Sequence, residues 1–158
     1  MTVTIRPVAP GDVDTILTLE AELFGSDAWS PEVVAAELGH PASHYVVLAD
    51  GEQIVGYGGL RSPGPGLPGD IQTLAIHPDY RGVGWGRKML VHLLDIAAAR
   101  QVPEVFLEVR ADNEAARHLY ERCGFREIDR RPGYYQPDGV DAIVMCRTEA
   151  VNGEGAER

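Results

Sequence analysis

The stretch "HPDYRGVGWGRKML", residues 77–90, places glycines at 82, 84 and 86, directly before basic and apolar residues. Glycine reaches backbone conformations that other residues avoid, and it lets a ligand come close to the main chain. Two readings of the stretch are open: a tight turn with solvated arginines, or a loop whose N–H groups contact the phosphates of a ligand. The sequence on either side of the loop has to decide between them.

The glycine loop joins a predicted strand to a predicted helix. Before it, "IQTLAIH", residues 71–77, is apolar on both faces, as expected for a strand in the middle of a sheet. The N-terminus of a helix offers unpaired N–H groups and a partial positive charge to an anion, and Arg81 and Arg87 add formal charge. The context therefore favours a phosphate-contacting loop. After the loop, apolar residues recur with the spacing of a core-packed helix, at Leu90, Leu93, Leu94 and Ala97.

Two familiar phosphate motifs are excluded by the residues themselves. A P-loop ends in Gly-Lys-Ser or Gly-Lys-Thr, which this loop lacks, and the dinucleotide fingerprint G-x-G-x-x-G fails because Arg87 stands at its third glycine. What remains is Arg81-x-x-Gly84-x-Gly86 followed by a helix. The pattern alone is weak, because glycine and arginine are common enough for it to arise by chance.

The whole sequence predicts an alternation of strands and helices. Alternating or continuous apolar runs indicate the strands, and apolar residues three or four apart indicate the helices. This order predicts an α/β (α+β) fold whose sheet contains antiparallel hairpins and right-handed crossovers. The predicted elements are, in chain order, a strand at 4–8, a helix at 10–25, a helix that starts at the N-cap Ser30 and stops by Gly39 to Pro41, strands at 44–50, 53–61 and 71–77, the helix after the glycine loop, a strand at 104–110, a helix capped by Asp112 or Asn113 and ended by Gly124, and strands at 125–131 and 141–147 joined by a loop at 132–139.

Composition is typical of a soluble globular chain. With 158 residues, 44% of them hydrophobic and 24% charged, the sequence fits a single domain, which we place at residues 1–148. We expect the polar residues 149–158 to form a disordered tail. No apolar run approaches a membrane span, and the first residues lack the apolar core of a secretion signal. The chain has only two cysteines, Cys123 and Cys146, which we expect to be reduced thiols. These features together predict a cytoplasmic protein without membrane association.

Net charge and histidine spacing argue against two classes of binding partner, nucleic acids and metal ions. The formal net charge of −10 argues against direct nucleic-acid binding, which requires a basic face. It suits a cationic substrate, although acidic proteins are often merely soluble. The five histidines show no ligand spacing, so we predict no metal.

Longer motifs carry a resemblance to a known family. The sequences "LAIHPDY", "RGVGWG" and "FLEVRADNEAARHLYERCGF", with the early "LFGSDAWS" and the late "GYYQPDGVDAIVM", resemble the GNAT superfamily of N-acetyltransferases. Within it they are most similar to the RimI branch, the ribosomal-protein-alanine N-acetyltransferases, over residues 3–147. The resemblance implies the GNAT fold, one mixed central sheet of about seven strands flanked by about four helices. It also implies an enzyme that uses acetyl-CoA as co-substrate.

The same resemblance implies which residues hold acetyl-CoA. The pyrophosphate would lie on the glycine loop, and backbone groups of residues 74–76 would hold the pantetheine arm and the acetyl carbonyl. Asn113 and Tyr120 would contact the cofactor from the helix that follows the strand at 104–110. The complete predicted set is Leu74, Ala75, Ile76, Arg81, Gly82, Val83, Gly84, Trp85, Gly86, Arg87, Asn113 and Tyr120.

Acetyl transfer to an amine needs a neutral amine, a stabilised oxyanion and a proton for the departing thiolate. An α-amino group has a pKa of about 7.7–8.0 and a lysine about 10.4, so an α-amine needs only a modest base. Glu108, between Leu107 and Val109 in an apolar strand, is the candidate, and its pKa should be raised unless Arg110 pairs with it. The residues alone leave both readings open, and the resemblance implies that Glu108 is the proton acceptor.

Tyr120 also has two readings. On pattern alone it is a core aromatic residue on a helix face, whereas the resemblance implies that it donates a proton to the thiolate of CoA. Asn113 precedes it by seven residues, or two helical turns, so we expect both to project from the same side of one helix.

Two further segments would border the peptide site, as the resemblance implies. They contribute Phe24 and Trp29 near the start of the chain and Tyr134 and Tyr135 near its end. For each of these aromatic residues, ordinary packing is the alternative.

The leading prediction is therefore a cytoplasmic Nα-acetyltransferase that acetylates the N-terminal residue of a protein, above all the N-terminal alanine of small-subunit ribosomal protein eighteen. An acetyltransferase of a small amine, such as a polyamine or an aminoglycoside, is one alternative, and a CoA-binding module without catalysis is another. The module would not need Glu108 or Tyr120, and "GYYQPDG" and "AWS" match the peptide-acting branch better than the small-amine enzymes. The oligomeric state is not predicted.

Overall fold

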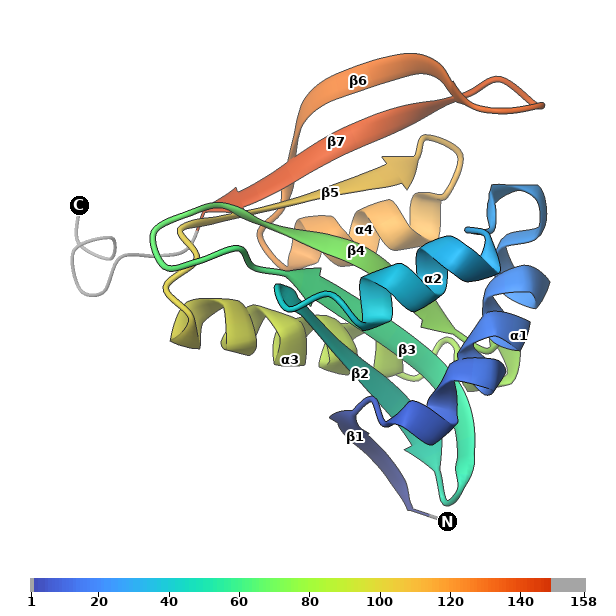
Figure 1. Cartoon of the computed structure of the whole chain (residues 1–158). Coiled ribbons are helices and arrows are strands. Elements are labelled where there is room, and N and C mark those ends of the chain that lie inside the picture. The colour runs from blue at the N-terminus through green and yellow to red at the C-terminus, as the bar shows by residue number, and fades with distance from the viewer. Residues whose placement is uncertain (1, 149–158) are drawn as a thin grey trace. The chain divides into compact units, whose positions relative to one another are not determined.

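The computed structural model describes residues 2–148, and the predicted tail at 149–158 lies outside this range. Within it, seven strands form one mixed sheet in the order β1-β2-β3-β4-β5-β7-β6, accompanied by four α-helices (Figure 1). This confirms the predicted fold class and the predicted order of strands and helices. The strands are β1 (Val3–Pro7), β2 (Ser43–Asp50), β3 (Gln53–Arg61), β4 (Gly69–Ile76), β5 (Glu104–Arg110), β6 (Arg126–Tyr135) and β7 (Val140–Thr148); the α-helices are α1 (Val13–Phe24), α2 (Pro31–Leu38), α3 (Trp85–Ala99) and α4 (Glu114–Arg122); and three short 3-10 helices are η1 (Pro10–Asp12), η2 (Gly25–Asp27) and η3 (Pro78–Tyr80).

The chain forms two compact units. The first comprises the described residues up to Arg61 together with Ile71–Leu93, and the second comprises Ser62–Asp70 and the described residues from Leu94 onward. The prediction of a single N-acetyltransferase domain over residues 1–148 stays a prediction.

The first unit is built on an antiparallel meander of β1, β2 and β3. Figure 1 shows α1 and α2 on one side of β2 and β3, and α3 on the other. On the side of α1, Ile16 and Leu19 are buried in a cluster with Val47 of β2 and Tyr57 of β3, which lie opposite each other in the ladder. The helical spacing of apolar residues in α1 predicts a face that packs into the core, and the structure confirms this.

Glycine in β3 lets α3 pack close to the opposite face of the meander. A Cβ at Gly58 would lie 3.2 Å from Cδ1 of Leu93 and 3.3 Å from Cε of Met89. Both side chains are fully buried, which confirms that the helix after the glycine loop packs into the core.

The start of α2 follows from two local residues. The Oγ atom of Ser30 accepts a hydrogen bond from the backbone N–H of Val33 at 3.2 Å, and Pro31 takes the first helical position. A proline there removes an N–H that has no helical partner in any case. The predicted N-cap of this helix is confirmed.

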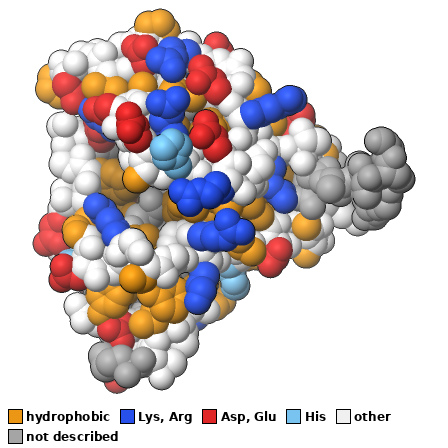
Figure 2. Space-filling model, turned by 180° about the vertical axis from the view of Figure 1, so that it is seen from behind, with side chains coloured by type: hydrophobic (Ala, Val, Ile, Leu, Met, Phe, Trp, Pro, Cys, Tyr) orange, Lys and Arg blue, Asp and Glu red, His pale blue; other side chains and the backbone are white. Residues whose placement is uncertain are grey.

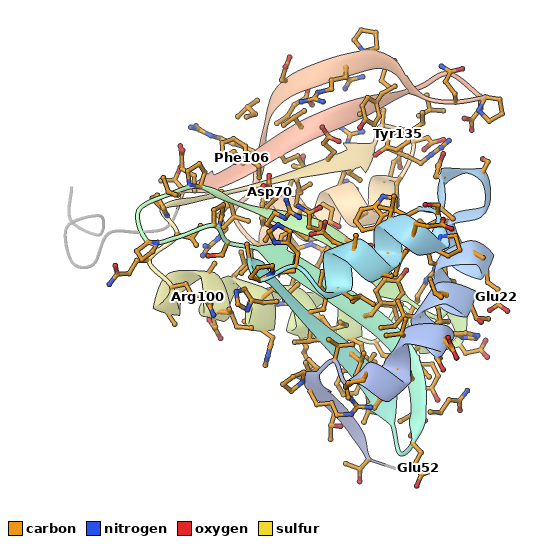
Figure 3. All side chains as sticks on the ribbon, in the orientation of Figure 1. Glu22, Glu52, Asp70, Arg100, Phe106 and Tyr135 are labelled. Carbon is orange, nitrogen blue, oxygen red and sulfur yellow. The ribbon has the colours of Figure 1, made fainter. Side chains whose placement is uncertain are left out.

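The second unit is built on β5, β7 and β6, which pair in antiparallel order. The beginning of β5 also pairs in parallel with the first two residues of β4, with Asp70 opposite Phe106 (Figure 3). Along β5, Leu107 and Val109 are buried, whereas Glu108 between them is exposed on the other face. This alternation is ordinary for a strand with one covered face.

One predicted boundary is wrong. Residues 132–139 were expected to be a loop, but β6 continues to Tyr135 and only residues 136–139 form the turn before β7. The ladder shifts register between Arg131 and Tyr135, and Gly133 in this segment has a φ of 62°. A bulge of this kind accommodates extra residues, and the strand continues after it. Proline and glycine in this segment are typical of a loop, which is why the sequence did not predict the continued strand.

Candidate active site

The glycine loop has the backbone that its composition suggests. Gly82 and Gly84 have φ values of 81° and 97°, which residues with a Cβ rarely adopt. α3 begins at Trp85, so Gly86 and Arg87 lie in its first turn rather than in the loop. A helix does follow the loop, as predicted, but the loop ends at Gly84 instead of Gly86.

The loop and the first turn of α3 are open to a ligand. Gly82, Val83, Gly84 and Arg87 are all exposed, and 70% of the surface of Val83 is accessible. The first N–H groups of an α-helix have no partner inside the helix and carry partial positive charge. Figure 2 shows Lys and Arg side chains on the face of the molecule seen from behind, although the formal net charge is −10.

Arg81 supports the loop from within. Its Nε donates a hydrogen bond to the carbonyl oxygen of Ile76 at 2.8 Å, which links the loop to the end of β4. The sequence predicted Arg81 as a cofactor-binding residue that adds positive charge to the loop, and not as a support of the loop. The hydrogen bond to Ile76 gives the side chain a structural role as well. A guanidinium has five N–H groups and this contact uses one of them, so the other four can still contact a ligand.

A second support of the loop was not predicted. The hydroxyl group of Tyr80, in η3, donates a hydrogen bond to the carboxylate of Asp50 at the end of β2. This hydrogen bond is the largest cause that raises the pKa of Tyr80. The contact joins residues 30 positions apart, so no local pattern could have revealed it.

The end of β4 places main-chain groups of residues 74–76 in the first unit. Ala75 and Ile76 are buried, and Leu74 is half-buried. A Cβ at Gly56 of β3 would lie only 2.7 Å from the carbonyl oxygen of Ala75, so the two backbones touch where the glycine stands. Parallel pairing with β5 covers Gly69 and Asp70, four or more positions before these three residues.

Phe24 and Trp29 pack against the core cluster to which Ala75 of β4 belongs. Both are partly buried and pack against the cluster that contains Tyr57 and Ala75. The first unit thus brings two predicted substrate residues together with one predicted cofactor residue.

A buried carboxylate beneath these aromatic residues was missed by sequence reasoning. Glu20 of α1 is 4% exposed, accepts a hydrogen bond from the hydroxyl group of Tyr57, and accepts another from the backbone N–H of Trp29 at 2.9 Å. A signal was available, because Glu20 stands four residues after the buried Ile16 on the apolar face of α1.

In the second unit, Glu108 has polar neighbours, which corrects the expectation of apolar surroundings. Its Oε2 lies 2.9 Å from Nη1 of Arg131, and 32% of its side-chain surface is accessible. The apolar residues beside it in sequence point to the opposite face of β5, so they do not surround the carboxylate. The alternative reading expected an ion pair of Glu108 with an arginine, and the structure shows one with Arg131. Arg110, the arginine named in that reading, pairs with Asp112 at 3.1 Å and with Asp138 at 2.6 Å.

Tyr134 and Tyr135 complete this polar face. The charge of Glu108, followed by burial and a hydrogen bond to the same carboxylate, raises the pKa of Tyr134. The guanidinium of Arg131 lies 5.8 Å from the ring centre of Tyr134, and that of Arg110 lies 5.1 Å from the ring centre of Tyr135. The structure therefore brings Glu108 together with Tyr134, and the ring centre of Tyr135 lies 5.1 Å from that of Tyr134.

Tyr120 is buried at 8% exposure, and its ring meets Phe125 edge-on with 5.8 Å between ring centres. Burial, with a smaller contribution from Tyr135, raises the pKa of Tyr120 to about 12. The hydroxyl group therefore keeps its proton at neutral pH. Tyr120 is both a core residue and a protonated donor, so the two readings of the sequence are compatible.

Asn113 is the one of the two predicted capping residues that caps α4. It is the N-cap of α4, with Oδ1 accepting a hydrogen bond from the backbone N–H of Ala116 at 3.1 Å, and α4 itself starts at Glu114. The capping prediction is confirmed. The seven-residue spacing does not by itself place Asn113 and Tyr120 on one side of a helix, because an N-cap residue does not have helical backbone angles, so that expectation stays a prediction.

Within residues 2–148, no three or more His, Cys, Asp or Glu side chains are grouped so that they could hold a metal ion. No helix in that part of the chain is long and apolar enough to cross a membrane. The prediction of no metal stays a prediction.

Comparisons with known proteins agree with this architecture. A model of the acetyltransferase (GNAT) family matches residues 13–125. The N-alpha-acetyltransferase RimI of Mycobacterium tuberculosis is 40% identical over 148 residues, which covers 92% of this chain and 92% of the relative. The crystal structure of the ribosomal-protein-S18-alanine N-acetyltransferase from Escherichia coli superposes with a TM-score of 0.85 at 30% identity, covering 97% of both chains. Arabidopsis thaliana NAA60 in complex with acetyl-CoA, at 18% identity and a TM-score of 0.80, covers 93% of this chain and 98% of its own, and shares the fold.

The chain belongs to the acetyltransferase (GNAT) family and is an acyltransferase. Within that family it is RimI-like, as the sequence motifs implied.

Proposed function

We propose that this protein is a cytoplasmic Nα-acetyltransferase that transfers the acetyl group of acetyl-CoA to the N-terminal alanine of ribosomal protein bS18. The observation that carries the proposal is the exposed carboxylate of Glu108, which Tyr134 contacts and Arg131 pairs with. The relatives support it, since the similar Escherichia coli enzyme is a ribosomal-protein-S18-alanine N-acetyltransferase.

The residues of the first unit fit acetyl-CoA. The loop from Arg81 to Gly84 is exposed, has two glycines that allow close approach, and leads into the N-terminus of α3. These features suit the pyrophosphate, and the main chain of residues 74–76 suits the pantetheine arm. The co-substrate supplies an activated acetyl thioester, and binding and orientation fall to these residues. Asn113, a residue of the second unit, would contribute its amide N–H₂ group, because its oxygen already caps α4.

Glu108 would accept the proton of the α-ammonium group. An α-amine with a pKa of about 7.7–8.0 is already partly neutral near pH 7, so a carboxylate can assist its deprotonation without an unusual environment. The exposure of Glu108 gives the proton a route to solvent. Arg131 and Tyr134 hold the carboxylate from β6, and this support does not depend on bound peptide.

Tyr120 would assist the departing thiolate of CoA. Its raised pKa of about 12 means that the donor proton is present over the whole physiological range. A thiol has a pKa of about 8.5, so complete transfer from Tyr120 in this environment is unfavourable by several kcal/mol. We infer that Tyr120 donates a hydrogen bond to the developing thiolate, which stabilises it without complete loss of the tyrosine proton.

The test is the release of CoA from acetyl-CoA in the presence of short peptides that begin with Ala, Ser, Gly or Met. Each peptide has a matched copy whose α-amine is blocked, and spermidine and a small aminoglycoside serve as alternative acceptors. We expect turnover with free α-amines, highest with alanine, and none with the blocked copies. Turnover with spermidine or the aminoglycoside alone would replace the proposal by a small-amine acetyltransferase, and cofactor binding without any turnover would replace it by a CoA-binding module.

A further inference from the structure

Glu20 is buried where an apolar residue would be expected. It lies on the buried face of α1, 4% exposed, between Ile16 and the end of the helix at Phe24. Burying a carboxylate is costly unless hydrogen bonds compensate for lost water, so its two partners define what it does. One partner is the hydroxyl group of Tyr57 on β3, and the other is the backbone N–H of Trp29.

Trp29 belongs to the segment that connects α1 to α2, residues 25–30, which we call the connector. The connector contains the short helix η2, closed by a bond from the N–H of Ala28 to the carbonyl of Gly25 at 3.1 Å. α2 begins only at Pro31, so Trp29 lies outside both α-helices. Its N–H is instead held by Glu20, nine residues earlier, at 2.9 Å.

The same carboxylate reaches the sheet through Tyr57. The ring of Tyr57 is part of the core cluster on which Phe24 and Trp29 rest, and its hydroxyl group donates to Glu20. Burial, followed by the hydrogen bond to Glu20, raises the pKa of Tyr57, so the hydroxyl stays protonated as a donor. Glu20 therefore ties the connector and β3 to one point, next to the aromatic side chains at the two ends of the connector.

We propose that Glu20 is a positioning residue for the acceptor peptide: it fixes the backbone of Trp29 against β3, and this sets the place of the aromatic wall formed by Phe24 and Trp29. The inference rests on the proposed function, because it assigns that wall to the peptide. It predicts a selective defect, since the glycine loop has its own supports in Tyr80 with Asp50 and in Arg81 with Ile76.

The first experiment compares Glu20→Gln, Tyr57→Phe and Glu52→Gln by steady-state kinetics with an alanine-starting peptide. Glu52 is an exposed glutamate in the turn between β2 and β3 of the same unit, which makes it a matched control (Figure 3). We expect Glu20→Gln and Tyr57→Phe to raise the KM for the peptide roughly tenfold, the effect of weakening a hydrogen bond to a charged group. The KM for acetyl-CoA should change less than the KM for the peptide in these two variants, and Glu52→Gln should leave both KM values unchanged. Folded variants with an unchanged peptide KM, or an equal rise in both KM values, would overturn the inference.

The second experiment observes Trp29 directly and needs no activity. In protein labelled with 5-fluorotryptophan, ¹⁹F NMR resolves Trp29 from Trp85, and Trp85→Phe assigns the two signals. Tyr57→Phe should shift or broaden the Trp29 signal, whereas Glu52→Gln should leave it in place. An unchanged Trp29 signal would overturn the anchoring role. If wild-type protein acetylates no peptide while this shift is present, the proposed function fails and the anchor stands, so the two failures are distinguishable.

Discussion

The carboxylate of Glu108 on β5 lies 2.9 Å from the guanidinium of Arg131 on β6, across the intervening strand β7. Tyr134, three residues further along β6, donates a hydrogen bond to the same carboxylate. Glu108 is thus oriented by groups from a single strand, β6, while part of its side chain stays open to solvent. We propose that this carboxylate receives a proton from an incoming amine.

Replacing Glu108 by Gln should lower kcat for an alanine-starting peptide by about 10²–10⁴-fold, the usual contribution of a general base. Affinity for acetyl-CoA should not change, because its proposed binding groups belong to other segments. Steady-state kinetics and calorimetric titration with acetyl-CoA measure the two effects. Glu104→Gln, an exposed glutamate of the same strand, is the control. A Glu108→Gln variant with normal turnover would show that another group accepts the proton.

Replacing Tyr120 by Phe should change how stability depends on alkaline pH. The pKa of Tyr120 rises from 10.0 to about 12 on folding, so its neutral form is favoured in the folded state. This contribution is complete below about pH 10 and is lost as the pH rises towards 12, and two pKa units correspond to at most about 2.7 kcal/mol. Urea unfolding at pH 9, 10 and 11 should therefore show a steeper loss for wild type than for Tyr120→Phe. Other buried tyrosines titrate in both proteins and cancel in the difference, so parallel curves would contradict the assignment.

The glycine loop and the connector illustrate how far the sequence alone reaches. The N-cap Ser30, a cap at Asp112 or Asn113, and a helix directly after the glycine loop follow from residues that are close together in the chain, and the structure confirms them with the start of α3 two residues earlier than predicted. The backbone freedom expected at Gly82 and Gly84 is likewise a property of the residues themselves. Helix caps and glycine backbone angles depend on residues that are adjacent in the chain, so they can be predicted without a structure.

The surroundings of Glu108 and Glu20 were not readable in this way. Arg131 reaches Glu108 across β7, in a ladder whose register shifts twice along β6. Tyr57 meets Glu20 from 37 positions away. Such contacts depend on strand order and register, which one sequence does not contain.

Replacing Gly84 by Ala should weaken acetyl-CoA binding beyond its effect on stability. The φ of 97° at Gly84 is strained for any residue with a Cβ, so the loop should shift and misplace its N–H groups. Gly51→Ala is the matched control, since Gly51 has a φ of 64° and lies in the turn between β2 and β3. Both variants should lose about 1–2 kcal/mol of stability, measured by thermal unfolding, and only Gly84→Ala should raise the Kd for acetyl-CoA. Equal affinities of the two variants would argue that the loop does not bind the phosphates.

Replacing Gly56 by Ala should disturb the main chain of β4. The new Cβ would start 2.7 Å from the carbonyl oxygen of Ala75, so one of the two backbones must move. Overpacking of this kind costs about 1–3 kcal/mol, and the shift should reduce acetyl-CoA affinity because Ala75 is a proposed pantetheine contact. Gly39→Ala, whose Cβ would meet the carbonyl of Ala35 at an ordinary 3.5 Å, is the control. A destabilised Gly56→Ala variant with unchanged affinity would separate the core role of this contact from cofactor binding.

The most direct test of the central claim is to locate the acetyl group on a reacted peptide by tandem mass spectrometry. The peptide begins with the N-terminal residues of ribosomal protein bS18 and carries an internal lysine. We predict one added acetyl group on the α-nitrogen of the N-terminal alanine, formed by wild type and nearly lost with Glu108→Gln. Acetyl on the lysine side chain, or on the α-nitrogen at equal rates in both proteins, would contradict the account.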